Sequence, residues 1–446
     1  MPTDLTDITW LFIEPQDVLL FRESRPFTAG ESLWARSVFP PLPMPFLGAL
    51  RAKAIVERGV SFDDYGDAVQ GRGASEKAKA LYEQIGGYDD YGPLRAFGPF
   101  PALKDERSVD LYVPVPANLA GRESGDTEFP VRLTPEKDPS WSGIKTNMPR
   151  TAAGPLYHWS ADEPVGETDR ALLRARHLLR YLNDDDPLSW GLDRKLQERE
   201  RRVGIALGSE GTAREGLLYT VEFIRMLNKD FSEQQRKPTR RAGFVIGLRG
   251  AEATGLLDAQ TKLLTLGGER RAASYEQVEP TETMETLFSG TPVVETLANE
   301  EKKRTRFLLY LATPAVFRNQ GWRPDFLSDP DDPTDDFPHS LGDLPEDLSF
   351  RLIAASAQKP TSIGGWDLGR GRPRTMYRAL PAGAVYVFET SDLMSKSQAE
   401  RLRDAFHLQP LHSTAPDEDA DGTDRDLKRL AQAGLGLTLL GASKAQ

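Results

Sequence analysis

The chain contains no cysteine and only five histidines among its 446 residues. Without cysteine it has no disulfides, no thiolate metal sites and no cysteine nucleophile. No apolar run approaches the roughly 18 residues that a membrane span needs. The first ten residues, MPTDLTDITW, carry acids but no basic region of the kind that opens a signal peptide. We therefore expect a cytoplasmic protein that makes no contact with a membrane.

An overall positive charge is also missing. The 56 Lys and Arg residues are outweighed by 67 Asp and Glu, which gives a net charge of -11. A general affinity for polyanions is thereby excluded, and any site for nucleic acid must be local. Much of the excess acid lies at 325–347 and 417–426, in segments whose Pro, Gly and Asp content predicts irregular surface loops.

One segment reverses this charge. Residues 359–378, KPTSIGGWDLGRGRPRTMYR, combine five basic side chains and one aspartate with four glycines and Trp366. Glycine lets the backbone adopt positive φ and approach a ligand closely. Arginine grips phosphate oxygens bidentately, and an indole offers a base a flat face. The composition predicts a site for single-stranded nucleic acid; the alternative is a solvated basic turn with Trp366 folded into the core.

Hydrophobic periodicity predicts an alternation of strands and helices. The expected strands are 9–21 with a break at Pro15, 216–227, 242–248, 307–312, 350–355 and 384–388. The expected helices are 45–59, 75–85, 169–182, 251–263, 395–406 and 426–433. We expect strand 242–248 to pair with strand 216–227. Between residues 63 and 160, glycine and proline recur too often for a count of regular elements apart from the short helix.

The length predicts two or three domains, at about 100 to 200 residues each. The order strand, helix, strand, strand, helix, strand is that of a ferredoxin-like unit with long insertions, and a second strand-rich unit follows it. We therefore predict an α+β protein with two ferredoxin-like (RRM-like) domains. The first covers residues 1–295 and carries the insertions, and the second covers residues 300–446.

Several short motifs occur in an order that resembles one family. They are IEPQDVLLFRESRPF, FPPLP followed by GALRAKA, RVGIALGSEGTAREGLLY, LGGERR, LATPAVF with a following Gly-Trp pair, and KPTSIGGWDLGRGRP followed by LPAGAVYVFE. Their joint order, across nearly the whole chain, is similar to that of the third RAMP-superfamily subunit of the type III-B CRISPR effector, the Cmr complex.

This resemblance implies a non-catalytic RNA-binding protein without cofactor or metal, used in antiviral defence. It implies that the chain holds the repeat-derived 5′ handle of the crRNA. The expected protein partners are the large palm-domain subunit and the adjacent backbone RAMP subunit, while target RNA is reached indirectly. The family's C-terminal glycine-rich loop is usually basic, whereas GLGLTLLGA lacks basic residues. We expect residues 359–378 to contact phosphates in its place.

The RNA contacts that we expect lie mostly on loops, with two on a predicted helix. They are Arg22, Arg25, Phe27, Arg51, Lys53, Arg150, Thr151, Arg270, Arg271, Lys359, Gly364, Gly365, Trp366, Arg370, Arg372 and Arg374. For Arg51 or Lys53 alone, simple solvation of a helix face is the more ordinary interpretation.

Two other functions compete with handle binding. A RAMP-type, metal-independent endoribonuclease that processes repeat RNA would need a histidine beside the RNA. None of His158, His177, His339, His407 and His412 adjoins a glycine-rich basic motif. A protein-only scaffold subunit is the second alternative, and in it the basic segments would face acidic groups of partner proteins.

Calcium binding is suggested by Asp417, Asp419, Asp421 and Gly422, which match the first half of an EF-hand loop. The bidentate glutamate that closes such a loop is replaced by Lys428, which would repel the ion. We therefore expect a solvated acidic loop without metal.

Overall fold

The computed structural model describes most of the chain. It covers residues 5–24, 34–124, 127–135, 156–157, 166, 168, 171–184, 191–193, 195–207, 213–232, 237–298, 305–318, 321, 323–324, 348, 350–390, 392–411 and 423–443. Within these ranges it contains several antiparallel sheets and eight α-helices, so the predicted α+β class is confirmed. None of the described helices is both long and apolar enough to span a membrane.

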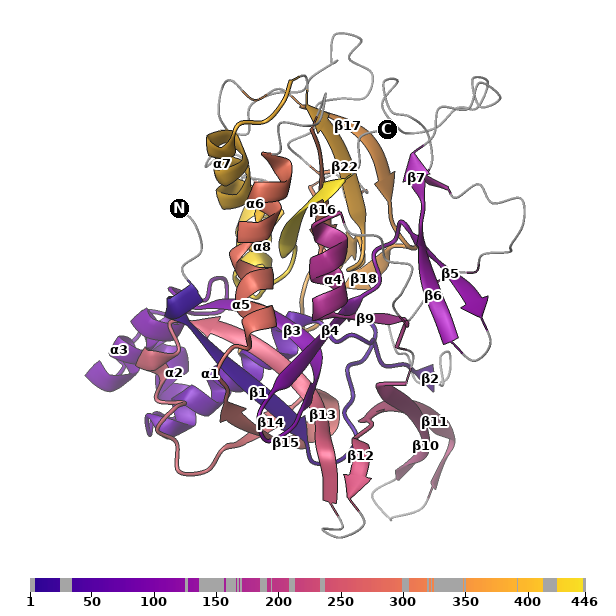
Figure 1. Ribbon diagram of the computed structural model, residues 1–446. Coiled ribbons are helices and arrows are strands. Elements are labelled where there is room, and N and C mark those ends of the chain that lie inside the picture. The colour runs from indigo at the N-terminus through magenta and orange to yellow at the C-terminus, as the bar shows by residue number, and fades with distance from the viewer. Residues whose placement is uncertain are drawn as a thin grey trace.

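The larger sheet occupies the lower half of Figure 1. Its strands lie in the order β14-β15-β1-β13-β3-β4-β9, and β12 adds to β13. All of its pairings are antiparallel. The bounds are β1 (Ile8–Pro15), β3 (Arg95–Lys104), β4 (Val109–Pro114), β9 (Leu172–Arg174), β12 (Lys229–Ser232), β13 (Lys237–Arg249), β14 (Leu263–Leu266) and β15 (Arg271–Gln277).

Four strands of this sheet follow a ferredoxin-like order. In space they lie in the order β15-β1-β13-β3. Numbered one to four along the chain, this order is 4-1-3-2, which is typical of a βαββαβ unit. Helices α1 (Pro43–Glu57), α2 (Phe62–Val69) and α3 (Glu76–Ile85) fill the first crossover. The second crossover contains two short 3₁₀ turns, Glu252–Thr254 and Gly268–Arg270, and the edge strand β14, but no α-helix. The predicted helix at 251–263 was therefore wrong.

The smaller sheet has the same strand order. It runs β17-β22-β16-β23, again fully antiparallel. Its strands are β16 (Arg306–Leu311), β17 (Phe350–Ser356), β22 (Val385–Thr390) and β23 (Thr438–Ser443). Helices α7 (Lys396–Phe406) and α8 (Thr423–Gln432) lie between the last two strands in sequence, while the described residues between β16 and β17 form no helix.

Three further helices belong to the core between the sheets. They are α4 (Ala175–Leu182), α5 (Glu282–Ser289) and α6 (Thr291–Leu297). One continuous hydrophobic cluster contains Phe12 of the larger sheet, Leu178 of α4 and Leu308 of the smaller sheet. A second cluster joins the other face of the larger sheet to α1 and α3, and also includes Leu427 of α8. The boundary at 295–300 stays a prediction.

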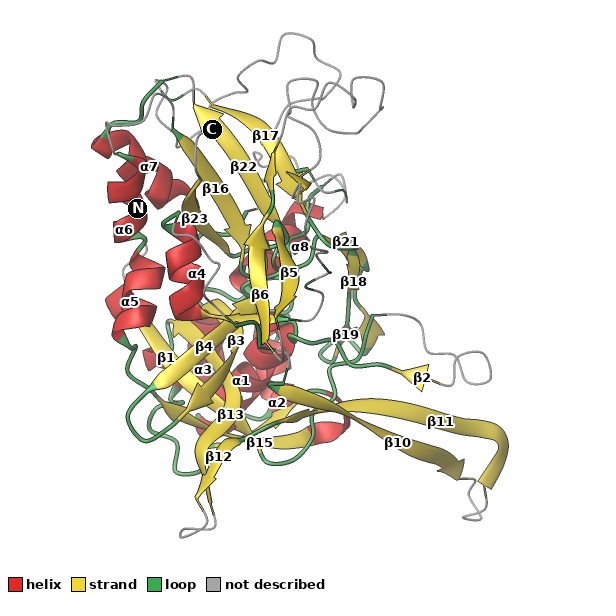
Figure 2. Ribbon diagram, turned by 45° about the vertical axis from the view of Figure 1, so that its right-hand side comes forward, coloured by secondary structure: helices red, strands yellow, loops and turns green. Residues whose placement is uncertain are grey.

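Smaller pieces surround these sheets. Figure 2 shows a long hairpin of β10 and β11 that extends away from the body. The peripheral strands are β2 (Trp34–Ala35), β5 (Leu119–Ser124), β6 (Thr127–Arg132), β7 (Thr134–Pro135), β8 (Leu156–Tyr157), β10 (Gln197–Leu207), β11 (Ala213–Met226), β18 (Thr361–Ile363), β19 (Trp366–Asp367), β20 (Arg372–Pro373) and β21 (Tyr377–Ala379). The predicted strand 216–227 is part of β11, but its partners are β10 and β2. Residues 242–248 pair instead with β1 and β3, so the predicted pairing was wrong.

Candidate nucleic-acid interface

Residues 359–379 form a narrow two-stranded ribbon, which we call the basic ribbon. At its root β18 pairs with β21, and nearer its tip β19 pairs with β20. Gly365 (φ 141°) and Gly371 (φ 63°) adopt backbone conformations that favour glycine. Trp366 is 58% exposed, so the interpretation that it folds into the core is wrong.

Asp367 organises the inner face of the basic ribbon. Its side chain is 5% exposed, and its carboxylate lies 3.5 Å from both Arg370 and Arg374. The carboxylate also accepts a hydrogen bond from the backbone N–H of Arg370 (3.2 Å). Burial lowers the pKa of Arg374, and the nearby Arg429 lowers it further. Part of the ribbon's positive charge is therefore balanced inside the protein.

The arginines of the ribbon differ in whether their side chains bind other groups of the protein. Arg370 donates two hydrogen bonds of 2.6 Å to Asp89, and those bonds lower the pKa of the Asp89 carboxyl. Arg372 and Lys359 are exposed, and neither side chain forms an ion pair or hydrogen bond with the described residues. Arg372 is thus the ribbon arginine best placed to meet a phosphate.

Three predicted segments that are far apart in the sequence meet at residues 20–24. The backbone N–H of Gly268 donates to the carbonyl of Leu20 (2.8 Å), which brings the LGGERR turn to this segment. Arg22 forms an isolated bridge with Ser37. Gly364, at the root of the basic ribbon, lies in contact range of Ser24. The sequence motifs thus converge on one place.

A tryptophan that we did not predict lies beside this meeting point. Trp34 is 38% exposed, and the guanidinium groups of Arg36 and Arg201 lie 4.3 and 4.7 Å from its ring centroid. β2, which begins at Trp34, pairs with β11. The buried Glu222 lies 3.7 Å from Arg201 and helps to hold it there. The signal in the sequence was the pair Trp34 and Arg36 in a segment with no other assignment.

We call this region the basic junction, and it consists of Arg22, Trp34, Arg36, Arg201 and Arg270. Arg270 is exposed and has a positive φ of 51°, so the turn after the two glycines presents it outward. Its neighbour Arg271 is instead held over Phe223 (4.7 Å to the ring centroid) and pairs with Glu269 (2.8 Å). The two guanidinium groups held over the Trp34 indole, together with the exposed Arg270, suit bases and phosphates.

The two predicted helical contacts have internal partners. Arg51 donates hydrogen bonds to the carbonyls of Ile85 (2.8 Å), Gly86 (2.9 Å) and Gly87 (2.7 Å). Lys53 pairs with Glu57 one helical turn later (2.5 Å). Arg51 therefore fixes the loop that follows α3. The remaining predicted contacts Arg25, Phe27, Arg150 and Thr151 lie outside the described residues.

The sheet faces are not available for RNA. In β1, Leu11 and Ile13 pack into one hydrophobic cluster, while Trp10 and Phe12 pack into the other. Both faces of the strand are therefore covered. All six residues of β22 are buried as well. Stacking of bases on an open sheet, the usual mode of an RRM, is excluded at these central strands, and the loops are left for binding.

The C-terminal glycine-rich loop joins the two sheets. Gly434 (φ 99°) lies so close to the β3 backbone that a Cβ would stand 2.8 Å from the Ala96 carbonyl oxygen. Its own carbonyl accepts a hydrogen bond from the Thr313 hydroxyl (2.7 Å). The neighbouring Leu435 and Leu437 are buried. These contacts support the expectation that this loop does not bind phosphate.

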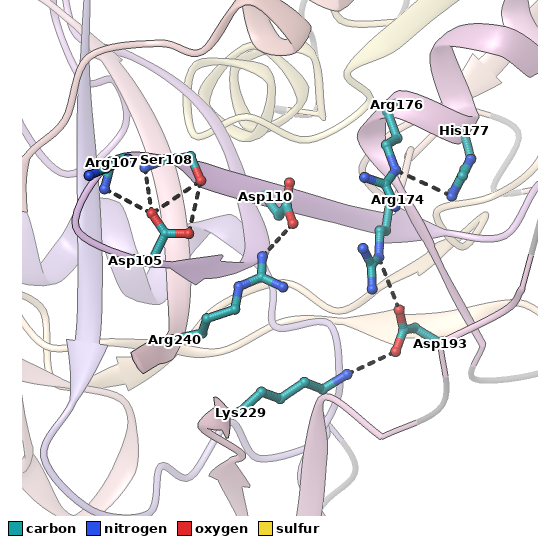
Figure 3. A network of polar contacts seen from close by, with 10 residues as sticks. All are labelled: Asp105, Arg107, Ser108, Asp110, Arg174, Arg176, His177, Asp193, Lys229 and Arg240. Carbon is teal, nitrogen blue, oxygen red and sulfur yellow. Dashed lines mark hydrogen bonds and ion pairs between the residues drawn. The ribbon is translucent and has the colours of Figure 1, made fainter. Parts of the chain in front are cut away.

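A separate polar network crosses the edge formed by β4, β9, β12 and β13 (Figure 3). Asp193 accepts from Lys229 (3.0 Å) and lies 3.4 Å from Arg174. Arg240 of β13 pairs with Asp110 of β4, and β3 lies between these two strands. Each of these cations has an acid beside it, and the pairs connect strands. We read this network as structural.

The described histidines are poor candidates for RNA cleavage. His407 is 4% exposed; its Nε2 lies 2.8 Å from the Leu287 carbonyl, and its Nδ1 accepts from the Leu440 N–H (3.1 Å). Burial lowers its pKa to about 4. Burial, together with Arg176 and other arginines, also lowers the pKa of His177 on α4 to about 4. Neither belongs to the basic ribbon or the basic junction.

No group of three or more metal-ligating side chains occurs in the part of the chain that the structure describes. The aspartates of the EF-hand-like stretch at 417–422 lie outside those residues, and Lys428 is an exposed residue of α8. His158, His339 and His412 also lie outside the described residues.

The observations define an α+β protein with two antiparallel sheets of ferredoxin-like strand order and with basic, aromatic loops. Residues 11–442 match the family model described as CRISPR-associated protein (Cas_Cmr3). The chain belongs to this Cas_Cmr3 family. The resemblance to the third RAMP-superfamily subunit of the type III-B Cmr complex is thereby confirmed.

Two solved structures show a distant likeness. One is a cryo-EM structure of the type III-B Cmr-beta bound to cognate target RNA and AMPPnP, state 1, with 13% identity, 94% coverage of each chain and a TM-score of 0.38. The other is Cmr-beta bound to cognate target RNA, with 12% identity, coverage of 96% of this chain and 98% of that one, and a TM-score of 0.40. These scores are too low to establish a shared fold. A comparison with curated protein sequences found no match.

Proposed function

We propose that this subunit binds the repeat-derived 5′ handle of the crRNA within a type III-B effector and performs no catalysis. In this proposal it also bridges the large palm-domain subunit to the adjacent backbone subunit, works in the cytoplasm and meets target RNA only through the complex. The observation that carries the proposal is the convergence at residues 20–24 of the first loop, the LGGERR turn and the root of the basic ribbon.

The chemistry of these surfaces supports an unpaired RNA strand as the ligand. Exposed Trp366 offers an aromatic face to a base, and the guanidinium groups of Arg36 and Arg201, held over Trp34, offer planar cations on which a base can stack. Arg270 and Arg372 offer guanidinium groups without partners among the described residues. Sequence-specific binding of RNA usually targets unpaired nucleotides through stacking and hydrogen bonds. A net charge of -11 makes indiscriminate binding unfavourable, so the local surfaces decide where RNA lies.

The test is purification of the tagged chain from its host with its natural partners, followed by sequencing of the RNA that co-purifies. We expect crRNAs with one common repeat-derived 5′ end, together with a large palm-domain protein. The double variant Arg270→Ala with Trp34→Ala should retain the protein partners but lose at least about tenfold of the affinity for handle RNA, because stacking contributes about 1–3 kcal/mol per base.

Arg107→Ala serves as the matched control, since Arg107 is an exposed arginine of the β3–β4 turn and belongs to neither surface. Intact assembly without RNA, or unchanged RNA affinity in the double variant, would support the protein-only scaffold. Metal-independent cleavage of repeat RNA by the purified chain would instead identify the endoribonuclease.

A further inference from the structure

A hollow of about 720 Å³ lies at the tip of the basic ribbon, away from the basic junction. Its walls come from the end of α2, from α3 and the loop after it, from the ribbon tip and from α8. The volume falls within the usual range for small-ligand sites, roughly 300–1,000 Å³. The side chains that matter for its chemistry are Gln70, Tyr82, Tyr88, Asp90, Arg372 and Arg425.

The loop at residues 85–92 forms one wall and is held firmly from behind. Arg51 binds three successive carbonyls of the loop, beginning at Ile85. From α8, the side chain of Gln432 accepts from the Tyr91 N–H (3.0 Å) and donates to the Gly92 carbonyl (3.0 Å). A wall held in this way keeps its shape before a ligand arrives, which lowers the entropic cost of binding.

The ribbon tip closes the opposite wall. Gly369 packs so tightly on Tyr88 that a Cβ there would stand 2.1 Å from the ring. Arg370 lies over the same ring, 5.1 Å from its centroid, and is anchored to Asp89 by two hydrogen bonds of 2.6 Å. The ribbon and the loop are therefore joined at Tyr88, and the hollow is a built feature of both.

Several polar groups that line the hollow have no protein partner among the described residues. The guanidinium of Arg372 and the side-chain amide of Gln70 form no hydrogen bond with them. Asp90 uses one carboxylate oxygen to accept from the Gly92 N–H (2.5 Å), which leaves the other oxygen for a ligand. The hollow therefore contains a guanidinium that can bind an anion, a carboxylate oxygen that can accept a hydrogen bond, and an amide that can do both.

This combination fits one unpaired nucleotide. The arginines of the hollow suit its phosphate, Tyr82 offers aromatic surface to its base, and Asp90 and Gln70 can read the base edge. A carboxylate accepts from an exocyclic amino group, which adenine, cytosine and guanine carry and uracil lacks. The one donor on the pairing edge of uracil, N3–H, lies between two carbonyl oxygens that a carboxylate repels, so the carboxylate disfavours uracil.

We propose that the hollow takes a single splayed nucleotide whose base carries an exocyclic amino group, with Asp90 as the residue that rejects uracil. This inference rests on the proposed function, because the same RNA would run from the basic junction along the ribbon. The ribbon connects the two places: its root at Gly364 lies against Ser24, and its tip lines the hollow.

The test uses the assembled effector subunit with its partners and a set of oligouridines about eight nucleotides long, each with one adenosine at a different position. We expect one position at which adenosine strengthens binding by roughly tenfold, as measured by fluorescence anisotropy. The variant Asp90→Asn keeps one oxygen for the Gly92 N–H and replaces the other with an amide NH₂. The preference for adenosine should then disappear or reverse toward uridine.

Asp258→Asn is the matched control, because Asp258 is exposed and lies outside the lining of the hollow. Arg372→Ala should weaken binding of every oligonucleotide in the set by a similar factor. The inference is overturned if no position favours adenosine, or if the preference survives in Asp90→Asn. If the inference fails in this way but Arg270→Ala with Trp34→Ala still weakens RNA binding, the proposed function stands. If the wild-type protein binds none of the oligonucleotides, the proposed function itself is contradicted.

Discussion

Arg370 and Arg372 lie two residues apart on the basic ribbon, yet their surroundings differ. Arg370 is engaged with Asp89 and Tyr88, whereas Arg372 has no ionic partner among the described residues. We expect Arg372→Ala to reduce the magnitude of the slope of log affinity against log salt for RNA by about 0.7, which corresponds to one lost phosphate contact on a single strand. Salt titrations by anisotropy would measure this.

The control for this experiment is again Arg107→Ala, which should leave the slope unchanged. Arg370→Ala should behave differently from Arg372→Ala, since it removes an internal ion pair and frees the Asp89 carboxylate. We expect a weaker attachment of the ribbon tip, seen as faster amide exchange at residues 366–372. Equal slopes for wild type and Arg372→Ala would place Arg372 away from the RNA.

His407 makes the stability of the fold depend on pH. Its folded pKa of about 4 lies below the ordinary value of 6.5, because burial disfavours the charged ring. The contribution of neutral His407 to the free energy of unfolding is therefore fully present above pH 6.5, and it is lost as the pH falls from 6.5 toward 4. For these two values we expect the free energy of unfolding to fall by about 2 kcal/mol between pH 8 and pH 5 through this residue.

Urea denaturation of wild type and His407→Gln at both pH values isolates this contribution, because the other ionisable groups are shared. Glutamine can donate to the Leu287 carbonyl and accept from the Leu440 N–H, but it does not titrate. The variant should therefore show a smaller difference between pH 8 and pH 5. His177, whose pKa is also lowered to about 4, should keep part of the dependence in both proteins.

Among the elements, the helix-to-loop transition after α3 depends on an arginine of α1. Arg51 donates to three carbonyls of the loop and lies 4.6 Å from the centroid of the Tyr91 ring. We expect Arg51→Ala to reduce the free energy of unfolding by about 3 kcal/mol, because partly buried carbonyls lose a charged donor. Lys53→Ala, which removes only the pair with Glu57, should cost within about 1 kcal/mol. Urea melts compare them, and similar losses for both would contradict the role of Arg51.

Elements whose periodicity and end residues all favour the same structure could be predicted from the sequence. The helix from Pro43 to Glu57 buries Phe46, Leu50, Ala54 and Ile55, the positions that its periodicity selects. Ser395 and Gln398 form a capping box at the start of α7. In these segments local preference and tertiary packing agree, so periodicity and end signals are sufficient.

Strand β3 could not be predicted, because its sequence RAFGPFPALK reads as a loop. Gly98, Pro99 and Pro101 interrupt it, yet it lies in the larger sheet beside β13. Its pairing with β4 begins only at Ala102, so the prolines occupy a stretch where β3 has no ladder with β4. Proline is tolerated where no backbone donor is required. The pairing of β3 with β13, rather than its local sequence, thus makes this segment a strand.

For the molecule as a whole, the position of the site depends on contacts between distant segments. The motifs around Arg22, Arg270 and Gly364 were predicted one by one, and the fold brings them together at residues 20–24. Trp34 could not be assigned, since its partner Arg201 is far away in sequence and reaches it only through the pairing of β2 with β11. Arg51 differs from Trp34 in its outcome: the sequence left it as a candidate RNA contact, but in the fold its side chain is bound to backbone carbonyls of the protein.

The two sheets should unfold together, because Gly434 fixes one against the other. A methyl group at this position would meet the Ala96 carbonyl oxygen at 2.8 Å, and its φ of 99° disfavours any side chain. We expect Gly434→Ala to reduce the free energy of unfolding by about 2–3 kcal/mol. Since one hydrophobic cluster contains Val245 and Leu308, amide exchange should accelerate in both sheets.

Gly48→Ala is the matched control, because Gly48 lies inside α1 and a Cβ there would meet nothing within 4 Å. This change should raise the free energy of unfolding by about 0.5–1 kcal/mol. Exchange measured by mass spectrometry on both variants distinguishes the two possible behaviours of the molecule. If Gly434→Ala accelerates exchange in β16 and β22 but leaves β1 and β13 protected, residues 1–295 and 300–446 are independent folding units. If exchange accelerates in all four strands, the shared cluster makes them one cooperative unit. A conformational change at the ribbon or the hollow can then affect both sheets.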